Sequence, residues 1–323
     1  MQVWHGPDEV PPLSGSVATL GMFAGMHRGH RAVVSRVRAL AHRHHVPAVA
    51  VTFTPHPLLV HHPERYHVQL TSLGQRLAAL EEMGMDATLL VRYTLPFSKL
   101  SPEEFVKEYF VDLLHARAVV VGEDARFGAG NSGDERTLRD LGERYGFEAV
   151  VLRDLVDPES GRRWSSTWVR EALSTGDVET AATVLGRPHL VRGEVVHGAK
   201  RGRQLGYPTA NLDTDDIGVV PADGVYAGWL TDGGIRYPAA ISVGTNPTFD
   251  GHRRSVEAHV LGRHDLDLYD HVVTVEFTHW IRPMLTFDGI AGLLDQMADD
   301  VARTADLLGV ARPALPHPAG PPA

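Results

Sequence analysis

Short apolar runs separated by amphipathic stretches make up the first half of the chain. The runs are rich in β-branched residues, as buried strands are, and they cover residues 16–23, 47–53, 87–91, 116–122 and 148–152. Apolar positions three and four residues apart predict helices between these runs, near residues 30–44, 71–84, 101–114 and 134–145. Strands that alternate with helices predict a doubly wound parallel sheet, in which ligands bind at the carboxyl ends of the strands.

The pattern changes near residue 186. Beyond it, apolar and polar residues alternate, as in half-buried antiparallel strands, within the segments LVRGEVV, GVYAGWL, YPAAISV, SVEAHVL and HVVTVEF. Turns rich in glycine, proline and aspartate separate these segments, which predicts a small antiparallel β-barrel closed by a helix over 286–309. We therefore expect an α/β domain over 1–187 and an all-β domain over 188–310. The remaining residues, 311–323, have too few apolar side chains to fold, and we expect them to be disordered.

The composition is typical of a soluble globular protein. Of the 323 residues, 43% are hydrophobic and 22% are charged, and this length favours two domains. The N-terminus has no apolar core of the kind found in signal peptides. No stretch approaches the roughly 18 apolar residues that a membrane span needs. These features predict a cytoplasmic protein without a membrane partner.

Charge and cysteine content exclude several further functions. The chain has no cysteine, which removes disulfides, thiolate nucleophiles and cysteine-bound metals. A formal net charge of −9 argues against nucleic acid as a partner. Several of the 19 histidines lie in runs such as 42–45 and 61–62. Because no acidic residues stand at ligand spacing, most of the histidines are interpreted as solvated surface residues and not as a metal site. The oligomeric state is not indicated.

The segment GMFAGMHRGH, residues 21–30, begins within the end of the first apolar run, directly after SVATL. Its glycines let backbone amides approach an anion closely, and the helix that follows adds the positive end of its dipole. Two histidines can then donate hydrogen bonds to phosphate oxygens. The alternative is a glycine-rich turn with incidental histidines. The candidate residues of this segment are Gly21, Phe23, Gly25, His27, Gly29 and His30.

Three other segments also lie at strand ends or helix starts. In SSTWVR, hydroxyls and a guanidinium at a helix start can clamp a phosphate, although an ordinary N-cap has the same residues. VGEDARFG and TFTPHP each place an aromatic ring and a polar side chain at the ligand edge of the sheet, although each could be a plain loop. The candidate residues are Phe53, His56, Asp124, Phe127, Ser165, Ser166, Thr167 and Arg170.

The second half contains VVHGAKRGRQLGYPTANL, residues 195–212. Its glycines and cations suit ATP phosphates but do not form a Walker loop, and the alternative is a solvated hairpin. Thr209 and Asn211 offer oxygen ligands suited to Mg²⁺. Glu257, in SVEAHVL, is the candidate base for an alcohol substrate, although a single strand carboxylate is more often a surface residue. The other candidates of the loop are Gly198, Lys200, Arg203, Gly206 and Pro208.

Together these motifs resemble a known family. HxGH with SSTxxR is similar to the nucleotidyltransferase superfamily, and GxFxGxHxGH, TFxPHP and VGxDxRFG are similar to the FMN adenylyltransferase module of bacterial bifunctional riboflavin kinase/FAD synthetases. GxxxGRxLGxPTAN, PADGVYAGWL, VEAHVL and DLDLYD resemble the riboflavin kinase module of the same enzymes, a six-stranded barrel. The resemblance spans nearly the whole chain, to about residue 309.

The resemblance implies two activities and a role for each candidate. The barrel would phosphorylate riboflavin to FMN, and the N-terminal domain would transfer AMP from ATP to FMN, giving FAD and pyrophosphate, both with Mg²⁺. His27, His30, Ser166, Thr167 and Arg170 would handle ATP phosphates. Thr209 and Asn211 would hold Mg²⁺ and phosphates, with Glu257 as base. Phe53, His56, Asp124, Phe127 and Tyr269 would border the flavin.

Two departures from the family pattern keep alternatives open. Ala24 stands where the family usually has aspartate, and Ala125 where it has phenylalanine. One alternative is therefore a riboflavin kinase whose N-terminal domain is impaired or redirected to another nucleotide or flavin. Another is a flavin-binding protein without turnover, which the PTAN segment and Glu257 argue against, because binding alone needs no positioned base.

Overall fold

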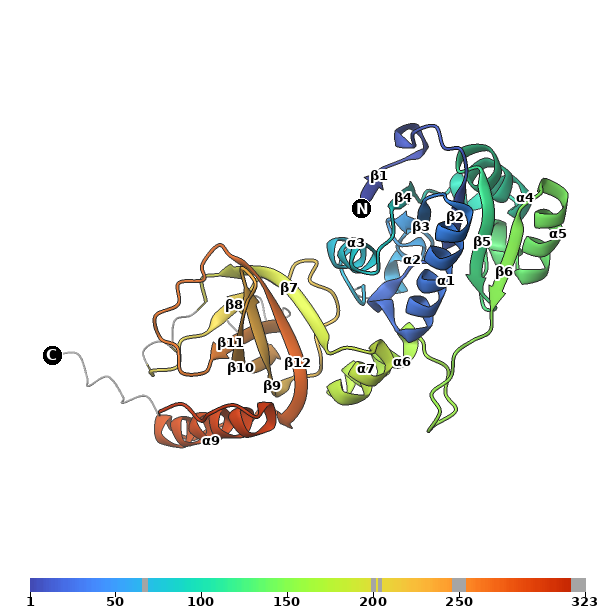
Figure 1. Ribbon diagram of the computed structural model, residues 1–323. Helices are drawn as coiled ribbons and strands as arrows, with labels where there is room; N and C mark the ends of the chain where they lie inside the picture. Colours follow the sequence, from blue (N-terminus) through green and yellow to red (C-terminus); the bar gives the residue numbers. More distant parts are fainter. Residues whose placement is uncertain (66–68, 199–201, 203–204, 246–253, 315–323) are drawn as a thin grey trace. The chain divides into compact units, whose positions relative to one another are not determined.

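The computed structural model describes residues 1–65, 69–198, 202, 205–245 and 254–314 (Figure 1). It divides into two compact units, Met1–His67 with Leu73–Ser165, and Val68–Ser72 with Ser166–Ala323. This division groups helices that precede residue 188 with the barrel. The boundary predicted between residues 187 and 188 separates the domains of the two expected activities. It stays a prediction, because the structural division is made by compactness and not by activity. Most of the tail expected to be disordered lies outside the described residues.

The first unit is built on a six-stranded parallel sheet, in the order β1-β4-β3-β2-β5-β6. The strands are β1 (Gln2–Trp4), β2 (Ser16–Leu20), β3 (Ala48–Thr54), β4 (Ala87–Arg92), β5 (Ala116–Gly122) and β6 (Glu148–Leu152). The helices are α1 (Arg28–His44), α2 (Pro57–His61), α3 (Leu73–Glu82), α4 (Pro102–Phe105), which continues as a π-helix over Val106–Leu113, and α5 (Glu135–Tyr145). Short 3₁₀ turns cover Pro7–Glu9, Ala24–Met26, Pro63–Arg65, Phe97–Lys99 and Ala129–Asn131.

Alternate residues of the central strands point into two separate hydrophobic cores, one on each face of the sheet. Val17 of β2 packs in the core formed with α1 and α3, whereas its neighbour Ala18 packs in the core formed with α4, the π-helix and α5. Strands buried on both faces are apolar at every position, as parallel strands in α/β proteins are. The predicted doubly wound sheet is confirmed, and Figure 1 shows helices on both of its faces.

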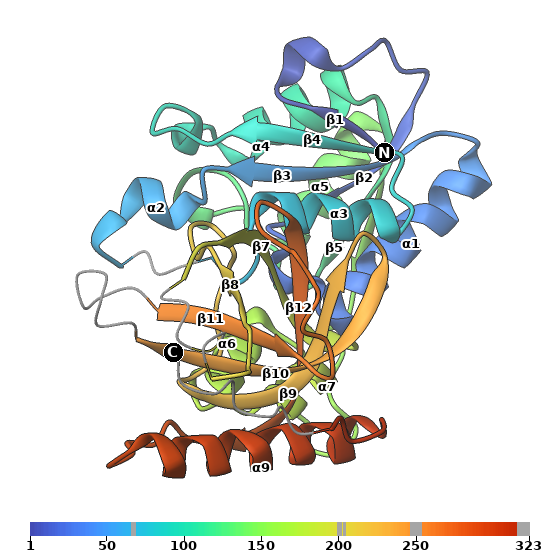
Figure 2. The ribbon, with the colours of Figure 1, turned by 90° about the vertical axis from the view of Figure 1, so that its left-hand side faces the viewer.

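The second unit contains a closed six-stranded barrel in the order β10-β11-β8-β7-β12-β9 (Figure 2). The strands are β7 (His189–Val196), β8 (Ala210–Leu212), β9 (Gly224–Asp232), β10 (Ile235–Thr245), β11 (Arg254–Val260) and β12 (Val272–Arg282), and the helices are α6 (Ser166–Ser174), α7 (Val178–Leu185) and α9 (Ile290–Leu308). All six strands pair antiparallel, so the predicted barrel is confirmed.

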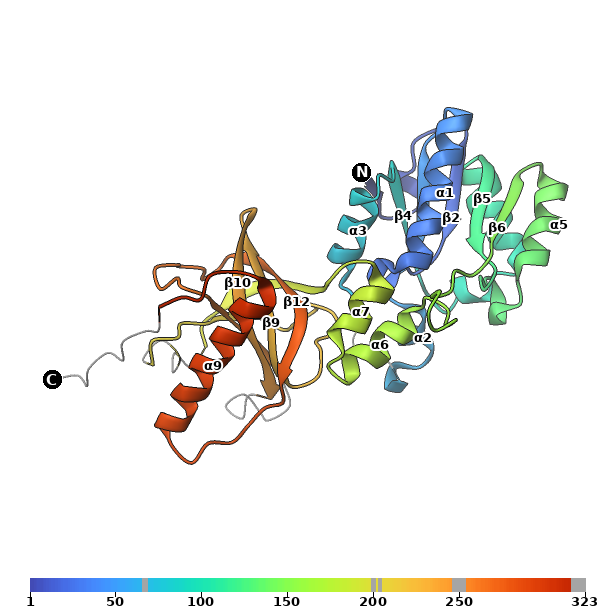
Figure 3. The same ribbon diagram turned by 60° about the horizontal axis from the view of Figure 1, so that its bottom comes forward.

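The final helix, α9, packs against β9, β10 and β12, and Figure 3 shows it alongside these strands. Its Val301 and Ala305 are buried against Tyr207 and Leu261. An ion pair between Arg282 Nη2 of β12 and Asp300 Oδ2 of α9, 2.6 Å long and almost fully buried, fixes the helix at one place along the barrel. Within the described residues no helix is long and apolar enough to span a membrane.

Candidate functional site

The turn between β2 and α1 has an unusual backbone. Phe23 (φ 48°), Gly25 (φ 74°) and Met26 (φ 49°) all adopt left-handed conformations, which cost about 1–2 kcal/mol for each residue other than glycine. The Phe23 side chain, 2% exposed, anchors the turn in the core beneath it. Ala24, one of the two departures from the family pattern named above, is the first residue of the 3₁₀ turn. The turn ends at His27, the residue before the first turn of α1.

The structure brings the two predicted histidines into direct contact. The rings of His27 and His30 stack with their centroids 3.7 Å apart, and Phe23 meets His30 edge to face at 5.5 Å. A Cβ atom on Gly29 would lie 3.1 Å from the His27 ring, so glycine makes room for this stack. The Nδ1 atoms of both rings are buried and have no hydrogen-bond partner among the described residues. Buried polar atoms of this kind are rare without a ligand or water.

Burial sets the charge of this pair. Desolvation lowers the pKa of His27 from 6.5 to about 4, against an opposing effect of Asp124, and Arg163 lowers it further. The pKa of His30 is also lowered, by burial and by His27. Both imidazoles are therefore neutral at pH 7, and each has one N–H to donate. An anion bound beside them would raise both pKa values.

The carboxyl ends of β5 and β6 carry an ion-pair network that the sequence analysis missed. Arg163 Nη1 lies 2.7 Å from Asp124 Oδ2 and 2.9 Å from Asp154 Oδ2. The predicted Asp124 is thus held at the edge of the sheet that carries the histidines. Nothing in the sequence distinguished Arg163 from the other charged residues of its loop. The neighbouring Ala125 closes the turn after β5 by donating its N–H to Gly122.

The predicted aromatic residues lie on one side of the first unit. Phe53, at the end of β3, contacts the ring of Phe105 at 6.5 Å, and Phe127 contacts the same ring at 6.2 Å. Phe127 is only 6% exposed and belongs to the core. His56 Nδ1 accepts a hydrogen bond from Leu58 N and so caps α2. Their roles toward a flavin stay predictions.

The SSTWVR segment begins a helix, as expected. Ser166 is the first residue of α6, and Thr167 and Arg170 follow within its first two turns. These residues belong to the second compact unit, whereas Ser165 and the histidine pair belong to the first. Their predicted joint action on one phosphate chain therefore stays a prediction.

In the barrel, strand register brings three predicted residues together. Asn211 of β8 and Glu257 of β11 are paired directly across the two strands. Thr209 Oγ1 donates to Glu257 Oε2 over 3.3 Å, and Asn211 Nδ2 donates to Thr209 Oγ1 over 3.3 Å. Because Asn211 Nδ2 faces Thr209, Asn211 Oδ1 points to the opposite side of the side-chain amide. The cluster presents a hydroxyl, an amide oxygen and a carboxylate from facing strands.

Gly198, at the start of the loop that leads to this cluster, lies close to it. A Cβ atom on Gly198 would lie 2.6 Å from the amide group of Asn211, so only glycine lets the loop come this near. Gly206 has a φ of 86°, which also favours glycine. The carbonyl oxygen of Pro208 is bonded to His259 Nδ1 at 2.8 Å, which ties the end of the loop to β11. Lys200 and Arg203 lie outside the described residues.

A pocket of about 280 Å³ opens beside the cluster. Among its lining residues are Gly198, Pro208, Thr209, Asn211 and Tyr269, all of them predicted site residues. The Tyr269 ring lies 4.0 Å from that of His197, which joins the two loops at the rim. Asp270, the next residue, has a left-handed backbone with a φ of 64°, a conformation that favours glycine.

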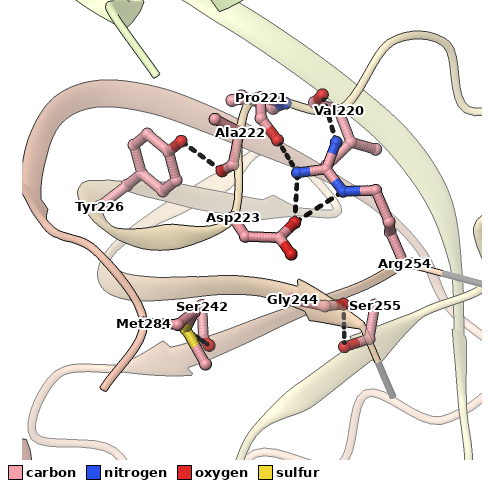
Figure 4. A network of polar contacts seen from close by, with 10 residues as sticks. All are labelled: Val220, Pro221, Ala222, Asp223, Tyr226, Ser242, Gly244, Arg254, Ser255 and Met284. Atoms are coloured by element: carbon pink, nitrogen blue, oxygen red, sulfur yellow. Dashed lines mark hydrogen bonds and ion pairs between the residues drawn. The ribbon is translucent and has the colours of Figure 1, made fainter. Parts of the chain in front are cut away.

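A second network supports the strand that carries Glu257. Arg254, at the start of β11, donates to Asp223 Oδ1 over 2.8 Å, to the Val220 carbonyl oxygen over 3.0 Å and to the Pro221 carbonyl oxygen (Figure 4). These bonds hold the loop before β9 against β11.

The fold and the two sites define a class of protein: a parallel-sheet nucleotidyltransferase domain joined to a kinase barrel. The model of the FAD synthetase family matches residues 10–168, and that of the riboflavin kinase family matches residues 185–308. The chain belongs to the family of bifunctional riboflavin kinase/FMN adenylyltransferases. The predicted family membership is confirmed.

Individual relatives match over nearly their whole length. The Escherichia coli K12 enzyme of this name is 35% identical over 304 residues, 94% of this chain and 96% of that one. The Bacillus subtilis enzyme is 32% identical and the Listeria monocytogenes enzyme 34%, each over 88% of this chain and 90% of its own. A crystal structure from Streptococcus pneumoniae, titled as a macrolide-efflux protein, aligns with a TM-score of 0.84 and 31% identity, covering 94% of this chain and 98% of that one.

Proposed function

We propose that the chain makes FAD from riboflavin in two ATP-dependent steps. The barrel phosphorylates riboflavin to FMN, and the parallel-sheet domain transfers AMP from ATP to FMN, releasing pyrophosphate. The observation that carries this proposal is the Thr209–Asn211–Glu257 cluster beside a pocket, in a chain that also contains a stacked histidine pair at a helix start. Both steps use ATP, which suits the cytoplasmic location that the sequence predicts.

For the kinase step, Glu257 is the general base. Its carboxylate accepts the proton of the ribityl 5′-hydroxyl while that oxygen attacks the γ-phosphorus of ATP and ADP leaves. The hydrogen bond from Thr209 Oγ1 fixes the orientation of the carboxylate in the absence of substrate. Gly198, which lies close to Asn211, begins the glycine-rich segment that covers the phosphates, and Tyr269 borders the flavin at the pocket rim.

For the adenylyl step, the protein positions two phosphates and stabilises charge. An oxygen of the FMN phosphate attacks the α-phosphorus of ATP, and pyrophosphate leaves. His27 and His30, neutral in the free protein, donate hydrogen bonds to oxygens that gain negative charge in the transition state. Ser166, Thr167 and Arg170 bind the departing phosphates, and Phe53, His56, Asp124 and Phe127 border the flavin.

The side chains of the barrel cluster fit Mg²⁺. Thr209 and Asn211 supply hard oxygen donors from one small cluster. This suits Mg²⁺, which binds through few protein oxygens together with phosphates and water. When bound, Mg²⁺ neutralises phosphate charge and orients the phosphate chain.

A time course tests both activities. Purified protein with riboflavin, excess ATP and Mg²⁺ is sampled, and riboflavin, FMN and FAD are separated by chromatography. We expect FMN to form first and FAD to follow. Accumulation of FMN alone would mean that the first domain does not adenylylate FMN, and trials with other nucleotides, and of Ala24→Asp with ATP, would follow. Absence of FMN would contradict the kinase assignment.

A further inference from the structure

Arg76 is a buried arginine that no motif in the sequence singled out. It lies on α3 in the first compact unit, and its side chain is only 3% exposed. Taking a guanidinium out of water is unfavourable unless hydrogen bonds compensate. The partners of this side chain therefore show what its charge is used for.

Those partners lie at the carboxyl ends of two neighbouring strands. Arg76 Nη1 donates to the Met22 carbonyl oxygen over 3.1 Å and to Thr52 Oγ1 over 3.2 Å, and Nη2 donates to the Phe53 carbonyl oxygen over 3.2 Å. Met22 follows β2, and Thr52 and Phe53 lie in β3. One planar group thus ties together the two strand ends from which the candidate residues Phe23 and Phe53 project.

The hydrogen bond from Arg76 to Met22 lies at the start of the left-handed turn. Met22 is the residue before the left-handed Phe23, so its carbonyl oxygen lies at the entrance to the turn that ends at His27. A backbone in sparsely populated conformations persists only where its surroundings fix it. The N–H of Gly21, which donates to Val51, fixes one side of this entrance, and Arg76 fixes the other.

We propose that Arg76 is a positioning residue for adenylyl transfer, which holds the 22–26 turn and therefore His27 and His30 in the geometry that the phosphates require. The inference rests on the proposed adenylyltransferase function. Arg76 contributes through the turn and not through contact with substrate. Its loss should therefore lower kcat for FAD formation far more than it changes the KM for FMN.

The test uses the full chain, whose barrel provides an internal control. FAD formation from FMN, ATP and Mg²⁺ is compared for wild type, Arg76→Met, Arg76→Lys and the matched control Arg139→Met, a half-exposed arginine of α5 paired with Glu135. We expect kcat to fall about 10²-fold in Arg76→Met, as for other small displacements of catalytic groups. Arg76→Lys should recover part of this loss, because an ammonium group can still donate to the carbonyl oxygens. FMN formation should stay within about twofold in every variant.

The outcomes separate the inference from the function on which it rests. If the wild-type protein makes no FAD, both the Arg76 inference and the proposed adenylyltransferase function are wrong. If wild type makes FAD and Arg76→Met does so with unchanged kcat, the inference is wrong and the function stands. A lower melting temperature with unchanged kcat at a temperature where the protein is folded would show a merely structural role. Should Arg76→Met fail to fold, Arg76→Lys decides: a kcat equal to that of wild type overturns the proposal, and a reduced kcat with unchanged KM supports it.

Discussion

The two candidate sites are built in opposite ways. In the barrel, Asn211 and Glu257 face each other because their strands pair in register, and the site needs little beyond the sheet itself. In the parallel-sheet unit, His27 and His30 are placed by a left-handed turn that other parts of the unit hold in position. A site on paired strands is fixed by backbone hydrogen bonds, whereas a site on a turn depends on remote side chains. We therefore expect the second kind to be easier to disable from a distance.

The largest effect is expected at Glu257. Replacing it by glutamine removes the proton acceptor but keeps the shape and the bond from Thr209, so FMN formation should fall about 10³-fold. FAD formation from added FMN should not change. The matched control is Glu276→Gln, a barrel glutamate that pairs with Arg236 on the outside. If Glu257→Gln forms FMN at the rate of wild type, another group is the base.

Substitutions in the histidine pair should impair FAD formation and leave FMN formation intact, the reverse of the result expected for Glu257. His27→Ala or His30→Ala removes one donor to the phosphate oxygens, so FAD formation should fall about 10²-fold while FMN formation continues. His42→Ala, at the exposed end of the same helix, serves as control. Unchanged FAD formation in both variants would show that the stacked pair is structural.

Stability should depend on pH through the buried His189 of the barrel unit. Its ring is bonded to the Val219 carbonyl oxygen at 2.7 Å, and burial lowers its pKa to about 4. The folded state therefore favours neutral histidine. This contribution to the free energy of unfolding is complete above pH 6.5 and is lost as the pH falls toward 4, by up to about 3 kcal/mol.

Chemical denaturation of wild type and His189→Gln between pH 4 and 7.5 checks this expectation. The glutamine variant keeps a donor for Val219 but cannot be protonated, so the free energy of unfolding of the barrel unit should depend less on pH. An identical pH dependence in both proteins would mean that other groups cause it.

The smallest effect concerns Asp270, at the pocket rim. Its left-handed backbone tolerates aspartate and suits glycine, so Asp270→Gly should change the free energy of unfolding by less than about 1 kcal/mol, whereas Asp270→Val should lower it by about 1–2 kcal/mol. Urea denaturation measures both. An equal loss in the two variants would show that the carboxylate, and not the backbone conformation, matters there.

Much of the fold was predictable because hydrophobic periodicity reports burial directly. The five predicted strands of the first unit and the change to alternating strands near residue 186 both appear in the structure. The dependence on periodicity also explains why two strands were missed. β1 (Gln2–Trp4) and β8 (Ala210–Leu212) have only three residues each, too few to show a period. The barrel reaches six strands only through β8, which also carries Asn211.

The site was predictable only as far as local motifs extend. HxGH and PTAN mark their own residues, but Arg76 and Arg163 act across contacts between distant segments. No local pattern separates such arginines from surface ones. Phe127 shows the opposite case, because a residue within a motif can also be a buried core residue. Partners that tertiary structure brings together cannot be read from spacing alone.

The central claim, that the chain has two independent activities, one at the histidine pair and one at the Thr209–Asn211–Glu257 cluster, is tested most directly by complementation. Glu257→Gln and His27→Ala are each incubated with riboflavin, ATP and Mg²⁺, first alone and then mixed. We predict essentially no FAD from Glu257→Gln and FMN with about 10²-fold slower FAD formation from His27→Ala. The mixture should form FAD much faster than either variant alone, because FMN released by one variant is adenylylated by the other. A mixture that accumulates FMN without forming FAD, or a single substitution that abolishes both reactions, would contradict the account.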